Sequence, residues 1–282
     1  MNCMRLFCFR APLKLSSYAR KTEWNLQNIR YRRTSPCKLT SPPKGTCFDI
    51  RNLELVQGTN AHGKAIRSFL YNHYWPREPS IVSLWMSPNS PYLDLLTDKY
   101  SYSGERILAY EYIPRTKERK LIGLCVCNKV YPWMVEELEQ WGHSTSTTPE
   151  RHRIYFIAHC IRSPSLFQKY KVEYIYDVRV EVLGTAAEVT GQGVGTILLQ
   201  TVLKEAKEQR HPLVQVIAVS QYGAKICEKV GMKQDWSMKY SDFIDDGGVK
   251  VFYPRSPHNN VYIYTKYFDP KLGGELPCLP PF

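Results

Sequence analysis

A glycine-rich turn between a strand pattern and a helix pattern constrains this chain more than any other feature. The turn, Thr190-Gly191-Gln192-Gly193-Val194-Gly195-Thr196, follows a β-branched run over 174–182 and precedes an amphipathic helical pattern over 197–210. Glycine lets the backbone approach a ligand closely, and a helix start offers unpaired N–H groups with partial positive charge. The sequence therefore predicts a phosphate- or pyrophosphate-binding turn.

The spacing of the three glycines excludes two common phosphate-binding motifs. A P-loop needs Lys followed by Ser or Thr after its second glycine, and neither follows here. A dinucleotide-binding fingerprint reads G-x-G-x-x-G near the first strand, whereas this turn lies late in the chain and its third glycine comes one position early. The turn therefore belongs to another class of site.

Hydrophobic periodicity predicts a mixed α/β domain with a sheet and helices on its faces. Helices are expected over 62–74, over 197–210, and over 222–230 with Gly231 as the C-terminal glycine. Strands are expected over 48–53, 106–113, 121–130, 174–182, 213–219, 249–253 and 261–268. The segment 133–170 is expected to be an insertion that mixes helical pieces with a flexible stretch over 142–149.

The basic charge of the chain is concentrated at its N-terminus. Residues 1–45 hold ten basic side chains and one acid, which is +9 of the formal +12, so the remaining body is nearly neutral. That distribution excludes a phosphate-reading nucleic-acid domain. We expect an N-terminal arm over 1–45, a folded domain over 46–270 and a C-terminal tail over 271–282.

The arm is rich in Arg, contains Ser and has a single acid at Glu23. This composition is typical of a mitochondrial presequence, and it equally fits a disordered basic tail. We therefore expect a cytoplasmic protein, or a mitochondrial one if the arm is a presequence. No run reaches the roughly 18 apolar residues of a membrane helix, so no membrane partner is expected. The nine cysteines show no metal-ligand spacing, so we expect no metal.

The glycine turn and a second segment resemble the GNAT acetyltransferases. Gly193 and Gly195 match the glycines of the family's Gln/Arg-x-x-Gly-x-Gly/Ala motif, with Thr190 at the Gln/Arg position as a departure. The segment 224–232, Ala-Lys-Ile-Cys-Glu-Lys-Val-Gly-Met, resembles the family's Ala-x-x-Tyr-Glu-Lys-x-Gly-Phe helix. The resemblance implies a twisted, mostly antiparallel sheet of about seven strands with helices on both faces, and acetyl-CoA as co-substrate.

The same resemblance assigns the cofactor-binding residues. In this family the strand ending near 183–185 splays from the strand over 213–219, and pantetheine lies in the gap. The expected contacts come from the end of that strand and from the turn: Leu183, Thr185, Thr190, Gly191, Gln192, Gly193, Val194, Gly195 and Thr196.

A looser resemblance to the insect-type arylalkylamine (dopamine) N-acetyltransferases indicates the acceptor side. Those enzymes have an apolar helix that ends in an aromatic turn and Glu-Pro, as the chain has in Glu78-Pro79, with the glutamate as base. Tyr71, Tyr74 and Trp75 are candidate walls of an aryl pocket, although aromatics at this spacing are also typical of a core. The alternative for Glu78 is a solvated acid before a proline.

The proton donor to the departing sulfur is less well defined by the sequence. Cys227 stands where many GNAT enzymes carry a tyrosine, although a buried cysteine is usually inert. Ser220 keeps one of the hydroxyls found in insect relatives, and Tyr222 is a neighbouring alternative.

These residues together predict a monomeric N-acetyltransferase that acts on a small primary amine, such as an arylalkylamine. The alternatives are another acceptor (an amino acid such as glycine, a polyamine or a protein) and a CoA-binding protein with degraded catalysis, which the departures at Thr190 and Cys227 would explain.

Overall fold

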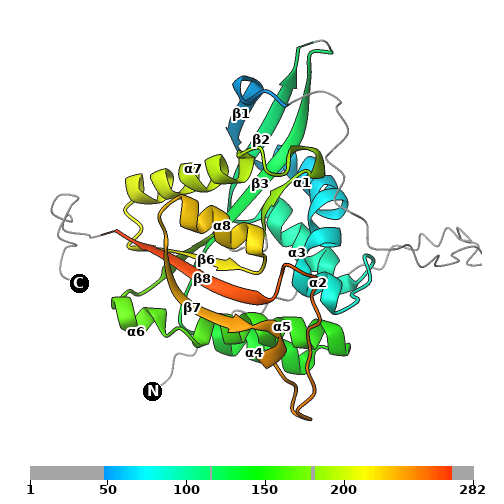
Figure 1. Ribbon diagram of the computed structural model, residues 1–282, viewed down its shortest axis with the longest axis vertical. Coiled ribbons are helices and arrows are strands. Elements are labelled where there is room, and N and C mark those ends of the chain that lie inside the picture. Colours follow the sequence, from blue (N-terminus) through cyan, green and yellow to red (C-terminus); the bar gives the residue numbers. More distant parts are fainter. Residues whose placement is uncertain (1–47, 115, 179–181, 269–282) are drawn as a thin grey trace, which may run out of the picture. The chain divides into compact units, whose positions relative to one another are not determined.

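The sheet of this protein has eight strands and is mostly antiparallel, as the computed structural model shows for residues 48–114, 116–178 and 182–268. Its order is β1-β2-β3-β4-β6-β8-β7, with β5 paired to β3 and one parallel pair, β4 with β6 (Figure 1). The strands are β1 Leu53–Gln57, β2 Glu105–Ile113, β3 Glu118–Val130, β4 Ile175–Val178, β5 Leu183–Thr185, β6 Leu213–Ala218, β7 Lys233–Lys239 and β8 Asn260–Tyr267. The predicted fold class is confirmed, with one strand more than expected.

Eight helices flank the described part of the sheet. They are α1 Gly63–Phe69, α2 Pro79–Ser83, α3 Pro91–Tyr102, α4 Met134–Ser144, α5 Thr148–Arg162, α6 Leu166–Tyr170, α7 Val194–Glu208 and α8 Gln221–Lys229. A π-helical turn, Leu70–Tyr74, extends α1, as the helix predicted over 62–74 required. Figure 1 shows α7 beside β2, β3 and β5, and α8 beside β6 and β8, in agreement with their contacts.

The two helices around the glycine turn form as their patterns predict. In α7, Leu198, Leu199 and Val202 make a fully buried stripe against the sheet, and the helix begins at Val194, three residues earlier than expected. Helix α8 ends before Gly231, whose φ of +72° is the left-handed conformation that glycine adopts without penalty at such an end.

The strand predicted over 174–182 is two strands with different partners. β4 runs parallel to β6 up to the pair Val178↔Val216, whereas β5 pairs with β3 alone among the described strands. Residues 179–181, which connect them, lie outside the described part. β5 therefore diverges from β6, which confirms the expected separation of the strand end at 183–185 from the strand over 213–219.

Two predicted strands are wrong. Over 48–53 the side chain of Asp49 accepts the backbone N–H of Arg51 at 3.0 Å and begins a 3₁₀ turn, so β1 starts only at Leu53. Over 249–253 the chain makes a single bridge, Ile244↔Lys250. The strand that was missed is β7, an edge strand whose residues are largely exposed.

The segment 133–170 consists of three helices, and the loop expected over 142–149 is the short connection 145–147 between α4 and α5. Helix α5 contributes fully buried side chains, among them Arg153, Phe156 and Cys160. Phe156 packs against Tyr240, Phe243 and Phe252, which come from the far end of the chain. The helical pieces expected in this segment are confirmed, and α5 contributes to the hydrophobic core, whereas the interpretation of the segment as an insertion stays a prediction.

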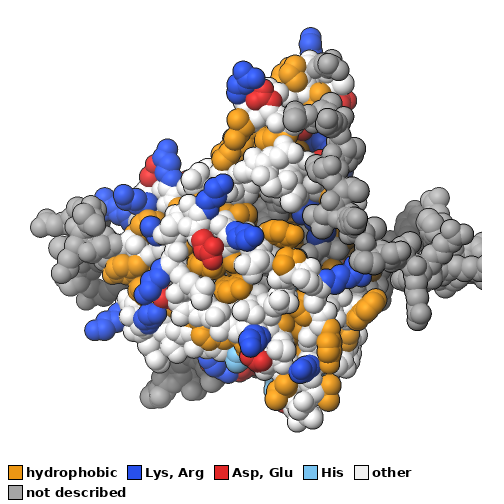
Figure 2. Space-filling view, in the orientation of Figure 1, with side chains coloured by type: hydrophobic (Ala, Val, Ile, Leu, Met, Phe, Trp, Pro, Cys, Tyr) orange, Lys and Arg blue, Asp and Glu red, His pale blue; other side chains and the backbone are white. Residues whose placement is uncertain are grey.

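Exposed apolar side chains gather on the loop after β7. Ile244, Val249 and Tyr253 are each more than half exposed, and hydrophobic atoms appear at the lower right of Figure 2, where this loop lies in Figure 1.

The arm over 1–45 and the tail over 271–282 lie outside the described residues. Among the described helices, none is long and apolar enough to cross a membrane.

Candidate active site

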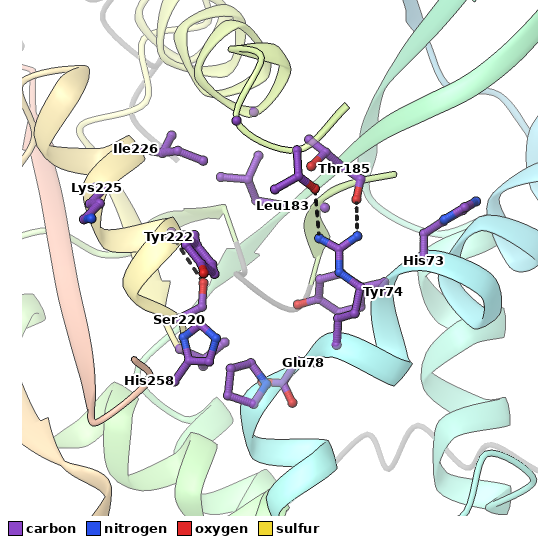
Figure 3. Close-up of a pocket in the computed structure, with 18 of the residues that line it drawn as sticks. His73, Tyr74, Glu78, Leu183, Thr185, Ser220, Tyr222, Lys225, Ile226 and His258 are labelled. Atoms are coloured by element: carbon purple, nitrogen blue, oxygen red, sulfur yellow. Dashed lines mark hydrogen bonds between the residues drawn. The ribbon is translucent and has the colours of Figure 1, made fainter. Parts of the chain in front are cut away.

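A cavity of about 660 Å³ opens where β5 and β6 diverge. Six segments line it: the turn after α1, helix α2, strand β5, the glycine turn with the start of α7, the end of β6 with α8, and the loop 255–258. Figure 3 shows side chains from these segments around the cavity, with Leu183 and Thr185 on one side and Ser220, Tyr222 and Lys225 on another.

The glycine turn places backbone donors at the cavity. Gly191 and Gly193 have φ values of +82° and +91°, and Gly193 directly precedes α7, whose first turn closes with Ile197 N–H on the Gly193 carbonyl at 3.0 Å. The N–H groups at the start of a helix have no partner within it. Val194, Gly195 and Thr196 occupy those positions, and all three line the cavity.

The three glycines of the turn have different roles. A Cβ built on Gly191 or Gly193 would meet nothing within 4 Å, so the space above these two residues is open to a ligand. A Cβ on Gly195 would lie 2.9 Å from Cδ1 of Ile226, so this glycine lets α7 and α8 pack closely. The first two serve the site directly, and the third serves the packing that shapes it.

The end of β5 turns its backbone polar groups toward the cavity. Backbone groups of an antiparallel strand alternate in direction, and Ala186 N–H points to β3, where it donates to the Ile122 carbonyl at 2.8 Å. The neighbouring residue Thr185, and Leu183 two residues before it, must therefore direct their groups away from β3. Consistent with this, the Thr185 carbonyl accepts a hydrogen bond from Arg77 Nη1 at 2.9 Å.

Two expected cofactor contacts differ in their placement. Thr190 lines the cavity, and its hydroxyl donates to the Ala186 carbonyl at 3.3 Å. Gln192 is exposed and does not line the cavity, because its amide donates to the Glu188 carbonyl at 3.1 Å on the outer side of the turn. The other seven expected contacts all line the cavity: Leu183, Thr185, Gly191, Gly193, Val194, Gly195 and Thr196.

Glu78 lines the cavity and is buried, with 3% of its surface exposed. Its carboxylate caps α2 by accepting the Ile81 N–H at 2.5 Å, and the Ser80 hydroxyl lies 2.8 Å and 2.9 Å from its two oxygens. Arg153 of α5 approaches to 3.8 Å. Burial opposes the charge of Arg153, but the facing Glu78 carboxylate raises the pKa of Arg153.

Ser220 and His258 lie near Glu78 in the same cavity (Figure 3). Ser220 caps α8 by accepting the Gly223 N–H at 3.0 Å, so its own hydroxyl proton remains available to another acceptor. Nδ1 of His258 accepts the Gln221 N–H at 3.2 Å. Burial lowers the pKa of His258, although Glu78 opposes the shift, and a neutral ring that accepts at Nδ1 carries its proton on Nε2.

The sequence did not select His258 or Arg153 for the site. His258 comes from a loop 180 residues after Glu78 in the chain, and Arg153 comes from the segment interpreted as an insertion. The one signal for His258 is its place in a proline-flanked loop, beside Pro257. No local pattern indicated Arg153.

Cys227 does not line the cavity. It is fully buried on the face of α8 that packs on the sheet, and burial raises the pKa of its thiol to about 12. The cavity is lined instead by the other face of α8, with Tyr222, Lys225, Ile226 and Lys229. The structure does not bring Cys227 to the cavity lining, so its role as a proton donor stays a prediction without structural support.

Of the three aromatic residues expected in the acceptor pocket, the structure brings only Tyr74 to the cavity. The Trp75 indole donates to Thr97 Oγ1 at 2.8 Å within the core. The Tyr71 hydroxyl donates to Asp94 at 2.5 Å on the α3 side of the helix. Pro79, Val82 and Tyr222 also line the cavity.

Cations dominate the charged lining of the cavity. Arg77, Lys225, Lys229 and Arg255 line it, and Glu78 is the one acid among its described lining residues. On the face seen in Figure 2, Lys and Arg side chains are spread among uncharged ones. No group of three His, Cys, Asp or Glu side chains that could hold a metal ion occurs among the described residues.

Comparison with solved structures identifies the fold. A mosquito arylalkylamine N-acetyltransferase like 5b superposes with a TM-score of 0.69 at 20% identity, over 77% of this chain and all of that one. An agmatine N-acetyltransferase gives 0.67 at 18% identity, and a polyamine N-acetyltransferase of Drosophila melanogaster gives 0.65 at 18%, over 77% and 76% of this chain and all of each neighbour. No protein-family model matches the sequence. The chain has the fold of the GNAT N-acetyltransferases.

Proposed function

We propose that this protein transfers an acetyl group from acetyl-CoA to the nitrogen of a small primary amine. One observation carries the proposal: a single cavity joins the glycine turn, the diverging end of β5 and the buried carboxylate of Glu78. The turn offers N–H donors to a pyrophosphate, the strand offers backbone groups to the pantetheine amides, and the carboxylate offers a base to an amine.

The proposed reaction is a direct attack in a ternary complex. Glu78 accepts a proton from the ammonium and passes it to water, so that a neutral amine meets the thioester carbonyl. The nitrogen–carbon bond forms, the carbon–sulfur bond breaks, and the nitrogen loses its second proton while the sulfur gains one. The Ser220 hydroxyl can relay that proton, because its oxygen already accepts from Gly223 and its hydrogen is not used there.

The lining of the acceptor end favours an amine with one positive charge and an apolar body, as an arylalkylamine has. Glu78 is the one acid among the described lining residues, so the second charge of agmatine or a polyamine would find no carboxylate. Tyr74, Val82 and Tyr222 provide apolar and aromatic surface. Arg255 supports a second candidate class, amino acids such as glycine, because its guanidinium could pair with a carboxylate.

An acceptor panel tests this proposal. Release of CoA from acetyl-CoA is measured with tryptamine, dopamine, agmatine and glycine on one preparation, with the arm over 1–45 removed. We expect tryptamine or dopamine to be the best acceptors, and a preference for agmatine would contradict the charge argument. Calorimetry separates the remaining alternative: acetyl-CoA that binds without turnover on any amine indicates a CoA-binding protein, and no binding at all overturns the proposal.

The role of the base is tested with Glu78→Gln. The glutamine oxygen can still accept from Ile81 N–H and Ser80, so the cap of α2 is kept while the base is lost. We expect kcat to fall by ~100-fold or more with little change in the Kd of acetyl-CoA. Glu118→Gln, on the exposed hairpin, is the matched control. Unchanged kcat in the Glu78 variant would refute the assignment.

The compartment and the oligomeric state stay predictions. We propose a monomer in the cytoplasm, or in mitochondria if the basic arm directs import. Locating the full chain and a chain without residues 1–33 in cells distinguishes the two compartments.

A further inference from the structure

The residue directly before the glycines, Thr190, lacks the long hydrogen-bond donor that the family motif has at this position. Thr190 stands where the family motif has Gln or Arg, and a threonine hydroxyl is shorter and uncharged. Here it is also engaged, because it donates to the Ala186 carbonyl. The loss would leave the pyrophosphate end of the cavity without the side-chain donor of the motif.

A cation from another element lies at this place. Arg77 follows α1 by eight residues, yet its Nη2 approaches the Thr190 hydroxyl to 3.4 Å while its Nη1 donates to the Thr185 carbonyl at 2.9 Å. In Figure 3, the dashed line that ends at Thr185 is the second of these bonds. The guanidinium thus lies between the end of β5 and the first residue of the turn, and Arg77 lines the cavity together with both.

The chemistry of this guanidinium suits a phosphate. Arginine carries five N–H donors in a planar fork that matches phosphate oxygens, and the two bonds to Thr185 and Thr190 use two of them. Burial lowers the pKa of Arg77, with Glu188 opposing the shift, but a guanidinium stays charged at neutral pH. Glu188 is itself paired with Lys120 at 2.6 Å, so it is already engaged by another cation.

We propose that Arg77 binds the pyrophosphate of acetyl-CoA. Its guanidinium, which comes from the segment after α1, replaces the Gln or Arg side chain that the family motif has at the position of Thr190. The inference rests on the proposed function, because it needs acetyl-CoA in the cavity. Such a contact would also link cofactor binding to the catalytic base, which the glycine motif alone does not do. Arg77 is followed directly by Glu78, so the residue that holds the phosphates and the residue that deprotonates the amine share one peptide bond.

The test compares donors with and without phosphates in Arg77→Gln. Calorimetry measures the Kd of acetyl-CoA, of its 3′-dephospho form and of S-acetylpantetheine, which has no phosphate. We expect the Kd to rise by ~10- to 100-fold for the first two, as the loss of a charge-assisted contact predicts, and to stay unchanged for S-acetylpantetheine. An equal loss for all three ligands would show that Arg77 only supports the wall, and no loss would exclude the contact.

Two further variants keep the test independent of folding. Adding Thr190→Arg to Arg77→Gln returns a cation from the motif position, and we expect it to recover most of the affinity for acetyl-CoA. Arg119→Gln removes an equal charge from the exposed hairpin, where Arg119 pairs with Glu54, and should change no Kd. If the unaltered protein binds acetyl-CoA but Arg77→Gln binds it equally well, only this inference fails. If the unaltered protein does not bind it, the proposed function fails as well.

Discussion

Replacement of Gly193 tests whether the turn receives a negatively charged ligand. Gly193 has a φ of +91°, and a Cβ there would meet no atom within 4 Å. Asn and Asp both tolerate the left-handed conformation better than other residues, so each substitution is expected to lower the free energy of unfolding by a similar amount, ~1–2 kcal/mol. The two variants have nearly the same shape and differ by one charge.

The charge sets the size of the expected difference. A carboxylate ~4 Å from a phosphate charge repels it by ~4 kcal/mol at an effective dielectric constant near 20, which is a factor of ~1000 in Kd. Calorimetry with acetyl-CoA should therefore show that Gly193→Asp binds at least ~100-fold more weakly than Gly193→Asn. Gly231 has a similar φ, +72°, and lies outside the cavity lining, so Gly231→Asp controls for backbone strain and should not change the Kd. Equal Kd values for the two Gly193 variants would refute an anionic ligand at the turn.

Three further outcomes follow from the described contacts. Cys227→Ala should leave kcat and KM unchanged in a CoA-release assay, since the thiol is buried away from the cavity. Its free energy of unfolding in urea should fall by only ~1 kcal/mol. A lower kcat without a loss of stability would show that Cys227 takes part in catalysis. Phe156→Ala should lower the free energy of unfolding by ~3–5 kcal/mol, and a change under 1 kcal/mol would mean that α5 is dispensable. Burial lowers the pKa of His211 and His258 below 6.5, so the unfolded chain binds protons more readily and the free energy of unfolding should fall as the pH drops from about 6.5. In His211→Gln the urea midpoint should therefore depend less on pH between pH 7 and about 5.5, and an unchanged pH dependence would contradict this.

The sequence predicted those elements that bury apolar side chains in the core. Helix α7 and strand β6 have strong apolar patterns because each packs on the core along its whole length. Strand β7 escaped notice because it lies at an edge, where Lys233 and Lys239 are exposed and few apolar residues repeat. Conversely, the apolar run over 249–253 resembles a strand, but Val251 and Phe252 are buried without continuous pairing.

The residues of the candidate site also differ in how far they could be predicted from the sequence. The glycine turn, Glu78 and Ser220 belong to short motifs with their own backbone requirements, so the sequence showed them. Arg153 reaches Glu78 from 75 residues away, and no local pattern predicts such a contact. The burial of Cys227 could have been predicted, because Ala224 and Cys227 are three residues apart and share the buried face of α8.

Because β5 diverges from β6, some backbone groups at the centre of the sheet have no neighbouring strand among the described residues to pair with when no ligand is bound. Where two strands separate, backbone amides that point into the gap exchange their hydrogens with solvent rather than being held by a neighbour. A pantetheine chain that pairs with Leu183 and Thr185 would act as a missing strand between them. Amide exchange at this short segment, 183–185, is therefore expected to report on occupancy of the cavity more directly than any change in the surrounding fold.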